Sequence, residues 1–133
     1  MNKKILLIED EDFIRQLYKD QIDSAGFDTD AFETGGEGLN AFRKNQYDLV
    51  VLDIILPDFN GLNILKEMKK DNFKKNTPVL ILSNADQDII IKQGLELGAE
   101  DYMQKVQSTP DMIVDKIKFI IDKKIKQKAN PLS

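Results

Sequence analysis

Five residues with chemically useful side chains stand at or near the ends of apolar runs, and they are Glu9, Asp10, Asp53, Ser83 and Lys105. Three carboxylates brought together repel one another, so such a cluster costs stability unless a cation lies among them. Mg²⁺ suits this set best, because it takes hard oxygen ligands and the chain has no Cys or His for a softer metal. A single Asp after a strand is usually a turn residue or a helix cap, so the inference depends on these residues converging.

The composition excludes several other functions. The absence of His excludes Ser-His and Cys-His catalysis, and the absence of Cys excludes disulfides and thiolate metal sites. With a net charge of −4, and 19 basic residues scattered among 23 acidic ones, no basic field is available for a polyanion, so we expect no direct nucleic-acid binding. No stretch could span a bilayer, and the opening apolar run is too short for a signal peptide. We expect a cytoplasmic protein.

Three continuous apolar runs predict strands that are buried on both faces, as in a parallel sheet covered by helices. The runs are Ile5 to Ile8, Leu49 to Leu52 and Val79 to Leu82, and two weaker strands are expected at Asp28 to Phe32 and Asp101 to Met103. Strands alternate with helical segments five times in a chain of single-domain size. We therefore expect an α/β fold with a doubly wound, five-stranded parallel sheet in the order 2-1-3-4-5, a flavodoxin-like three-layer sandwich.

Helical periodicity and capping residues mark the segments between the strands. The markers are the stripe Ile14, Leu17, Tyr18 and Ile22 closed by Gly26, the capping-box spacing Thr34 to Glu37, the stripe Leu62, Leu65 and Met68, Asp86 ahead of Ile91 and Leu95, and Thr109-Pro110 ahead of Ile113 and Ile117. In a parallel sheet all the carboxyl ends of the strands lie along one edge, and ligands bind where the winding reverses. That reversal separates the first strand from the third, so Glu9, Asp10 and Asp53 should share one pocket.

The sequence resembles the receiver domain of two-component response regulators from about Lys3 to Lys124, and the order and spacing of its motifs agree with that family. The matching residues are Glu9-Asp10, the segment Asp53-Ile54-Ile55-Leu56-Pro57 with Gly61, Ser83, Tyr102 and Lys105. The resemblance assigns residues 1–124 to a receiver domain and leaves 125–133 as a helix end and flexible tail. The sequence also resembles the chemotaxis-regulator type, because it offers no output domain, and we therefore expect a stand-alone receiver.

The resemblance implies that Asp53 accepts a phosphoryl group from a phosphohistidine on a sensor histidine kinase or phosphotransfer protein. It implies Mg²⁺ held by Glu9, Asp10, Asp53 and the backbone carbonyl of Ile55. Lys105 and Ser83 would neutralise phosphoryl oxygens, and Ser83 with Tyr102 would form the switch. Such a protein catalyses only its own phosphorylation and dephosphorylation and turns over no separate substrate.

The chain departs from the family pattern at three positions. Val106 follows Lys105 where the family has a cis proline, so we expect a trans bond there. Ile55 and Asn84 are expected to hinder the hydrolytic water and prolong the phosphorylated state. These departures keep a phosphorylation-independent protein-interaction module as the alternative function.

A haloacid dehalogenase-type phosphatase would need a second Asp where Ile55 stands, and a nucleotide or flavin carrier would need a Gly-rich or hydroxyl-rich phosphate loop after the first strand.

Surplus apolar residues suggest surfaces for partners. Three consecutive isoleucines, residues 89–91, spread over more of a helix than a core stripe needs, so at least one should face outward. The resemblance assigns output or self-association contacts to the fourth helix, fifth strand and fifth helix, and we expect a face there that includes Ile90, Tyr102 and Phe119. Phe13 could meet the kinase or pack under the sheet.

Overall fold

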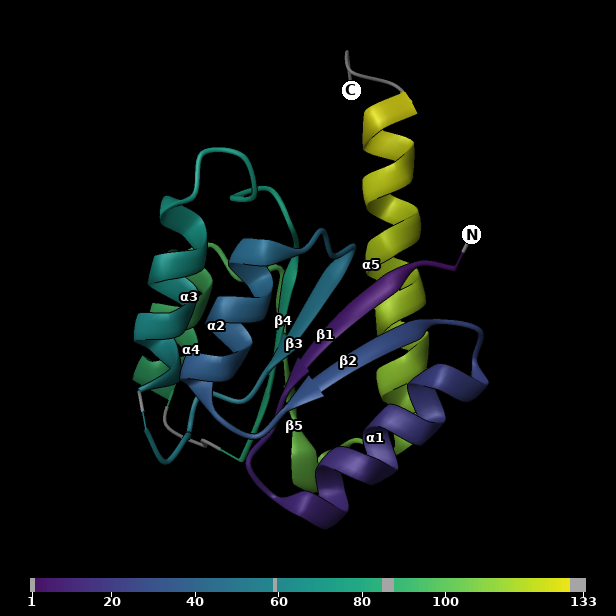
Figure 1. Ribbon diagram of the computed structural model, residues 1–133, viewed down its shortest axis with the longest axis horizontal. Helices are drawn as coiled ribbons and strands as arrows, with labels where there is room; N and C mark the ends of the chain where they lie inside the picture. Colours follow the sequence, from purple (N-terminus) through teal and green to yellow (C-terminus); the bar gives the residue numbers. More distant parts are fainter. Residues whose placement is uncertain (1, 59, 85–87, 130–133) are drawn as a thin grey trace.

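The computed structural model describes residues 2–58, 60–84 and 88–129 and contains one parallel sheet (Figure 1). Its strands are β1 (Lys4–Ile8), β2 (Asp28–Phe32), β3 (Leu49–Leu52), β4 (Val79–Ser83) and β5 (Asp101–Gln104). They are ordered β2-β1-β3-β4-β5 and all pair in parallel, which confirms the predicted fold and strand order. β4 and β5 each run one residue further than predicted.

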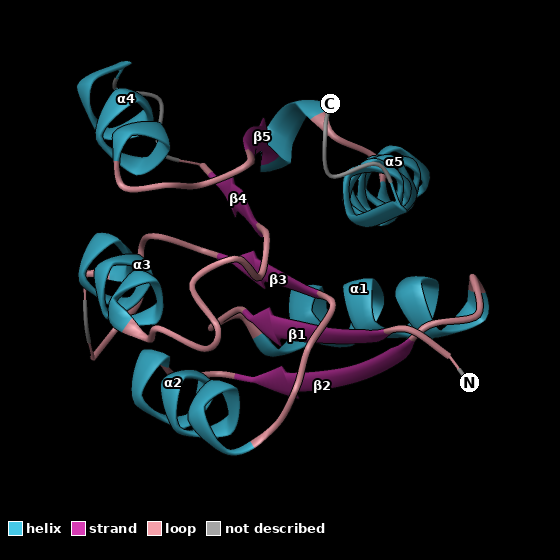
Figure 2. Cartoon of the chain, turned by 90° about the horizontal axis from the view of Figure 1, so that it is seen from above, coloured by secondary structure: helices cyan, strands magenta, loops and turns pink. Residues whose placement is uncertain are grey.

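Helices cover both faces of the sheet, and Figure 2 shows α1 with α5 on one side and α2, α3 and α4 on the other. The helices are α1 (Asp12–Ser24), α2 (Gly35–Lys44), α3 (Gly61–Lys70), α4 (Asp88–Glu96) and α5 (Pro110–Ala129), with a 3₁₀ turn at Lys105–Gln107. Alternate strand residues enter opposite cores: Leu6 and Ile8 face α2 and α3, whereas Ile5 and Leu7 face α1 and α5. Burial on both faces explains why the three strong strands are continuously apolar.

The predicted helix ends are formed by local chemistry. Gly26 follows α1 with φ of 99°, a left-handed conformation that favours glycine, and its N–H donates to the carbonyl of Asp23 at 3.0 Å. The Thr34 hydroxyl accepts the N–H of Glu37 at 3.2 Å, and that of Thr109 accepts the N–H of Met112 at the same distance. Asp86, the predicted cap of α4, lies outside the described residues, as does the chain after Ala129.

Two apolar residues that marked the predicted helices do not lie in the core. Leu17 is 39% exposed and Leu95 is 45% exposed. In α4 the buried position is Gly94, where an added Cβ would lie 2.5 Å from Cδ1 of Ile81, so this helix rests on β4 through a residue without a side chain. Among the described residues, no helix combines the length and the apolar character needed to cross a membrane.

Candidate functional site

The residues predicted to converge do meet at the carboxyl edge of the sheet. Glu9 follows β1, Asp53 follows β3, Ser83 ends β4, and Lys105 follows β5. Because β1 lies beside β3, ligand oxygens of Glu9, Asp10 and Asp53 all lie within 4.8 Å of one another. Hydrophobic burial of β1 and β3 as neighbouring strands therefore fixes the positions of the acids.

Asp53 is 4% exposed and is surrounded by hydrogen-bond donors. Its Oδ1 accepts the hydroxyl of Ser83 at 2.7 Å and the backbone N–H of Ile55 at 2.9 Å. Its Oδ2 accepts the ammonium of Lys105 at 2.7 Å. Donors on both oxygens hold the carboxylate in one orientation and offset the cost of burying its charge.

Lys105 bridges two carboxylates, because its Nζ also lies 2.5 Å from Oε2 of Glu9. Burial lowers the pKa of the Lys105 ammonium, but its hydrogen bonds to Asp53 and Glu9 outweigh burial, and the net shift is upward. Burial raises the pKa of the Glu9 carboxyl, and the ammonium of Lys105 opposes that rise. The lysine is therefore held charged as the internal counter-ion of the cluster.

The donor set fits a hard divalent cation. Three carboxylates against one ammonium leave an excess of negative charge, and every side-chain ligand is an oxygen. A cavity of about 140 Å³ opens over Asp10, Asp53 and Lys105, which leaves room for bound water beside an ion. Ile55 stands at the mouth of this cavity with a side chain that is 58% exposed.

Two polar residues that the sequence analysis missed hold the loops around the acids. Arg15 donates from Nη1 to the carbonyls of Glu9 at 2.9 Å and Asp10 at 3.3 Å, and from Nη2 to Oδ1 of Asp12 at 2.6 Å. Its position three residues after an acidic residue in the first turn of α1 was the available signal. Arg15 thus fixes the loop that carries two of the three carboxylates.

Asp58 performs the same task for the loop after Asp53. Its two carboxylate oxygens accept the backbone N–H groups of Gly35 and Gly36, each at 2.9 Å, at the start of α2. Gly61 then lets α3 begin against the strand end, since an added Cβ there would lie 2.2 Å from Cα of Ile54 and 2.7 Å from the carbonyl oxygen of Asp53. The glycine of the predicted motif is therefore required by a close backbone approach.

The remaining predicted residues lie around this centre. Tyr102 is half-buried, with its hydroxyl 3.5 Å from the carbonyl oxygen of Ser83. Val106 is exposed, and no cis peptide bond occurs among the described residues, as expected for the bond after Lys105. Phe13 is 78% exposed, which rules out the expectation that it packs under the sheet.

The outward-facing isoleucine of the three in α4 is Ile89, which is 64% exposed. Ile90 is half-buried and packs against the core on the α2 and α3 side. Phe119 of α5 is 63% exposed. The expected partner face is therefore apolar at Ile89 and Phe119, while Ile90 is largely committed to the fold.

Comparison with known proteins agrees with this architecture. The family model described as "Response regulator receiver domain" matches residues 5–118. The alkaline phosphatase synthesis transcriptional regulatory protein PhoP of Bacillus subtilis is 36% identical over 121 residues, which cover 91% of this chain and 49% of that protein. The chain thus spans about half the length of the curated relatives it matches.

Solved structures of receiver domains have the same fold as this chain. The Francisella response regulator 1452 receiver domain is 32% identical, with a TM-score of 0.85 over 92% of this chain and 99% of that one. A CheY-like receiver domain protein from Methanospirillum hungatei is 25% identical, with a TM-score of 0.90 over 96% of this chain and 99% of that one. The chain belongs to the family of response regulator receiver domains.

Proposed function

We propose that this receiver domain is a phosphorylation-driven switch whose phosphoryl acceptor is Asp53. The observation that carries the proposal is the buried carboxylate of Asp53 within hydrogen-bonding distance of both Ser83 and Lys105. A histidine kinase or phosphotransfer protein supplies the group as a phosphohistidine. A carboxylate oxygen of Asp53 forms the new bond to phosphorus, the bond from phosphorus to the imidazole nitrogen breaks, and the imidazole leaves with that electron pair.

The residues around Asp53 position and neutralise the transferred group. In a loose transition state negative charge gathers on the phosphoryl oxygens, so donors fixed in advance lower its free energy. Lys105 and Ser83 already point at the carboxylate that will carry the group, and small movements bring their donors onto phosphoryl oxygens. Glu9, Asp10, Asp53 and the carbonyl of Ile55 would hold Mg²⁺, which supplies further charge neutralisation when bound.

Phosphorylation would change the surface through Ser83 and Tyr102. When the Ser83 hydroxyl leaves Oδ1 of Asp53 for a phosphoryl oxygen, the end of β4 is drawn inward. The Tyr102 hydroxyl lies near the Ser83 carbonyl, so a movement of Ser83 changes the contact that Tyr102 makes. The two arrangements are pre-existing states whose populations the phosphoryl group shifts.

Exposed apolar residues indicate where the phosphodonor and an output protein would bind. Phe13 is exposed beside the acidic loop and is a contact for the phosphodonor. The face formed by α4, β5 and α5, with Ile89, Tyr102 and Phe119, meets an output protein or a second copy of the chain. Direct contact with nucleic acid is not part of this role. Because kinase phosphohistidine is made from ATP, the site of action is the cytoplasm.

The test uses beryllofluoride, which adds to a carboxylate oxygen and then has the tetrahedral shape of a phosphoryl group, supplied with Mg²⁺ to ¹⁵N-labelled protein. We expect amide shifts at Ser83, Tyr102 and Lys105 that are absent in Asp53→Asn. Identical shifts in the two proteins would show that Asp53 is not the acceptor. No shifts in either would favour a phosphorylation-independent interaction module, in which Lys105 serves only to neutralise the acids.

A further inference from the structure

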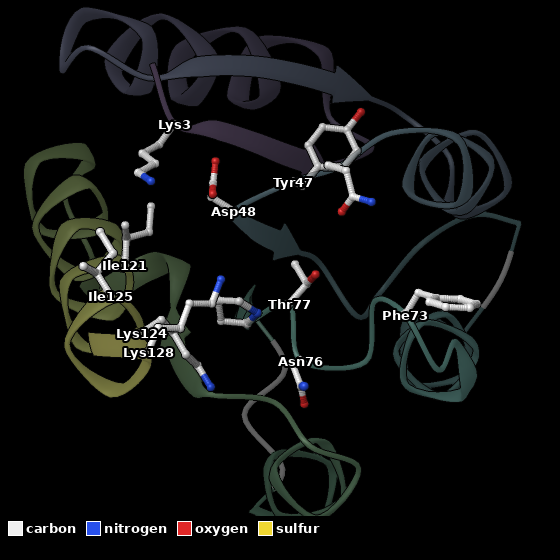
Figure 3. A pocket seen from close by; sticks show the side chains of 12 residues that line it. Lys3, Tyr47, Asp48, Phe73, Asn76, Thr77, Ile121, Lys124, Ile125 and Lys128 are labelled. Atoms are coloured by element: carbon white, nitrogen blue, oxygen red, sulfur yellow. The ribbon is translucent and has the colours of Figure 1, made fainter. Parts of the chain in front are cut away.

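A second concave surface lies at the opposite edge of the sheet, where the strands begin. It has a volume of about 390 Å³ and is lined by Lys3 ahead of β1, Asp48 ahead of β3 and Thr77 ahead of β4 (Figure 3). One wall is the last part of α5, with Ile125, and Phe73 of the turn after α3 stands on the opposite side of the cavity. We call this surface the amino-edge groove. The acids occupy the carboxyl edge of the same parallel strands, so the two sites lie at opposite ends of the sheet.

The turn that carries Phe73 is pinned in place. Lys69 Nζ donates to the carbonyls of Lys75 and Thr77, each at 3.0 Å. Lys74 Nζ donates to three carbonyls at the end of α2, those of Phe42, Arg43 and Asn45, at 2.6 to 2.8 Å. These lysines therefore hold the wall of the groove in a fixed shape in the free protein.

Phe73 is 95% exposed on that fixed turn, and Ile125 is 46% exposed across the groove. A large apolar side chain exposed to this degree adds almost nothing to the folded core. Because the hydrogen bonds hold the backbone of the turn in place, a partner has to order only the ring, and burying that ring yields a large favourable free energy. The groove thus has exposed apolar side chains on two sides, Ile125 on the α5 wall and Phe73 on the opposite turn.

The rim of the groove is cationic, with Lys3, Lys124 and Lys128 on its α5 side. The acid in the groove, Asp48, is engaged by the protein itself, since its Oδ2 accepts the backbone N–H of Lys4 at 2.7 Å. The Nζ of Lys124 forms an ion pair with Oε1 of Glu100 at 2.6 Å, whereas Lys3 and Lys128 have exposed side chains at the rim. In a protein of net charge −4, these lysines place a positive rim around a groove that is lined by both polar and apolar side chains.

We propose that the amino-edge groove binds an acidic peptide segment of a partner protein, with carboxylates at Lys3 and Lys128 and apolar side chains against Ile125 and Phe73. The concave shape disfavours a bilayer, which needs a flat or convex contact. Because the groove is preformed and lies at the far edge from Asp53, binding does not depend on phosphorylation, so it anchors the receiver in both of its states.

The test uses a fluorescein-labelled peptide in which glutamates alternate with leucines, followed by fluorescence anisotropy with the full chain. We expect saturable binding and ¹⁵N amide shifts confined to the groove. Lys3→Glu with Lys128→Glu should weaken binding about tenfold, and Phe73→Ser should weaken it by a similar factor. Both sets of changes replace exposed side chains, and circular dichroism is used to check that each variant is folded.

The matched charge control is Lys66→Glu with Lys92→Glu, which reverses two exposed lysines on α3 and α4. This control and Asp53→Asn should both bind the peptide as the wild type does. The proposal is overturned by unsaturable binding, by equal losses in the control, or by equal binding of a peptide with serines in place of leucines. Tighter binding to phosphatidylserine vesicles than to the peptide would also overturn it, as would self-association of the free chain through the groove.

Discussion

Replacing Lys105 by methionine should sharply destabilise the protein, because it removes the counter-ion and leaves two buried carboxylates. The Lys105 side chain is 10% exposed, and those of Glu9 and Asp53 are 2% and 5% exposed. Breaking a buried ion pair by removing one partner costs roughly 3–5 kcal/mol, and here one ammonium serves both acids. We therefore expect the free energy of unfolding to fall by about that amount at neutral pH without Mg²⁺.

The assay is urea unfolding followed by circular dichroism. Lys116→Met is the matched control, since Lys116 pairs with Asp101 at 2.8 Å on the surface, with side chains 33% and 42% exposed. Its loss should cost only about 0–1 kcal/mol. Adding Glu9→Gln and Asp53→Asn to Lys105→Met should restore most of the lost stability, because no uncompensated charge then remains buried.

Mg²⁺ provides the second arm of this experiment. An ion bound among Glu9, Asp10 and Asp53 would take over the role of the missing ammonium, so excess MgCl₂ should stabilise Lys105→Met more than the wild type. A loss for Lys105→Met no larger than that for Lys116→Met would refute the internal counter-ion. An equal response of both proteins to Mg²⁺ would refute the carboxylate cluster as the metal site.

Three further predictions concern single residues. Ile55→Asn should speed loss of the phosphoryl group, because Ile55 stands at the cavity mouth and limits access for water; an unchanged rate by phosphate release would remove that role. Without metal, the raised pKa of Glu9 means that the folded state keeps the Glu9 proton at a pH where the unfolded state has already lost it. The free energy of unfolding of the wild type should therefore fall relative to that of Glu9→Gln as pH rises from 4.5 to the raised pKa. Urea titrations that show the opposite sign would contradict this expectation. Gly61→Ala should destabilise the fold by roughly 1–3 kcal/mol through its clash with the backbone of Ile54, and wild-type thermal stability would disprove the close approach.

The sheet and its acidic edge were predictable because they depend on hydrophobic pattern. Continuous apolar runs identify strands buried on both faces, and parallel strands bring their carboxyl ends together. Once β1 and β3 are neighbours, Glu9 and Asp53 must share an edge, and the structure brings them within reach of one metal ion. The location of the site follows from the fold alone.

The polar details were less predictable, because they depend on which residues meet across long separations. Asp58 caps α2 from a loop far along the chain, and only the folded structure shows this contact. Helical periodicity shows which residues share a face of a helix but not how wide the neighbouring surface is, so it did not predict that Leu17 and Leu95 are exposed. The amino-edge groove has the same origin, since its walls come from separate loops and the end of α5.

If Asp53 accepts one phosphoryl group in a metal-dependent reaction, the intact mass of the protein reports the transfer. The experiment compares wild type and Asp53→Asn after incubation with acetyl phosphate, with and without Mg²⁺. We expect a single phosphoryl adduct on the wild type that requires Mg²⁺, and no adduct on Asp53→Asn. An adduct on both proteins, or on neither, would contradict this role of Asp53.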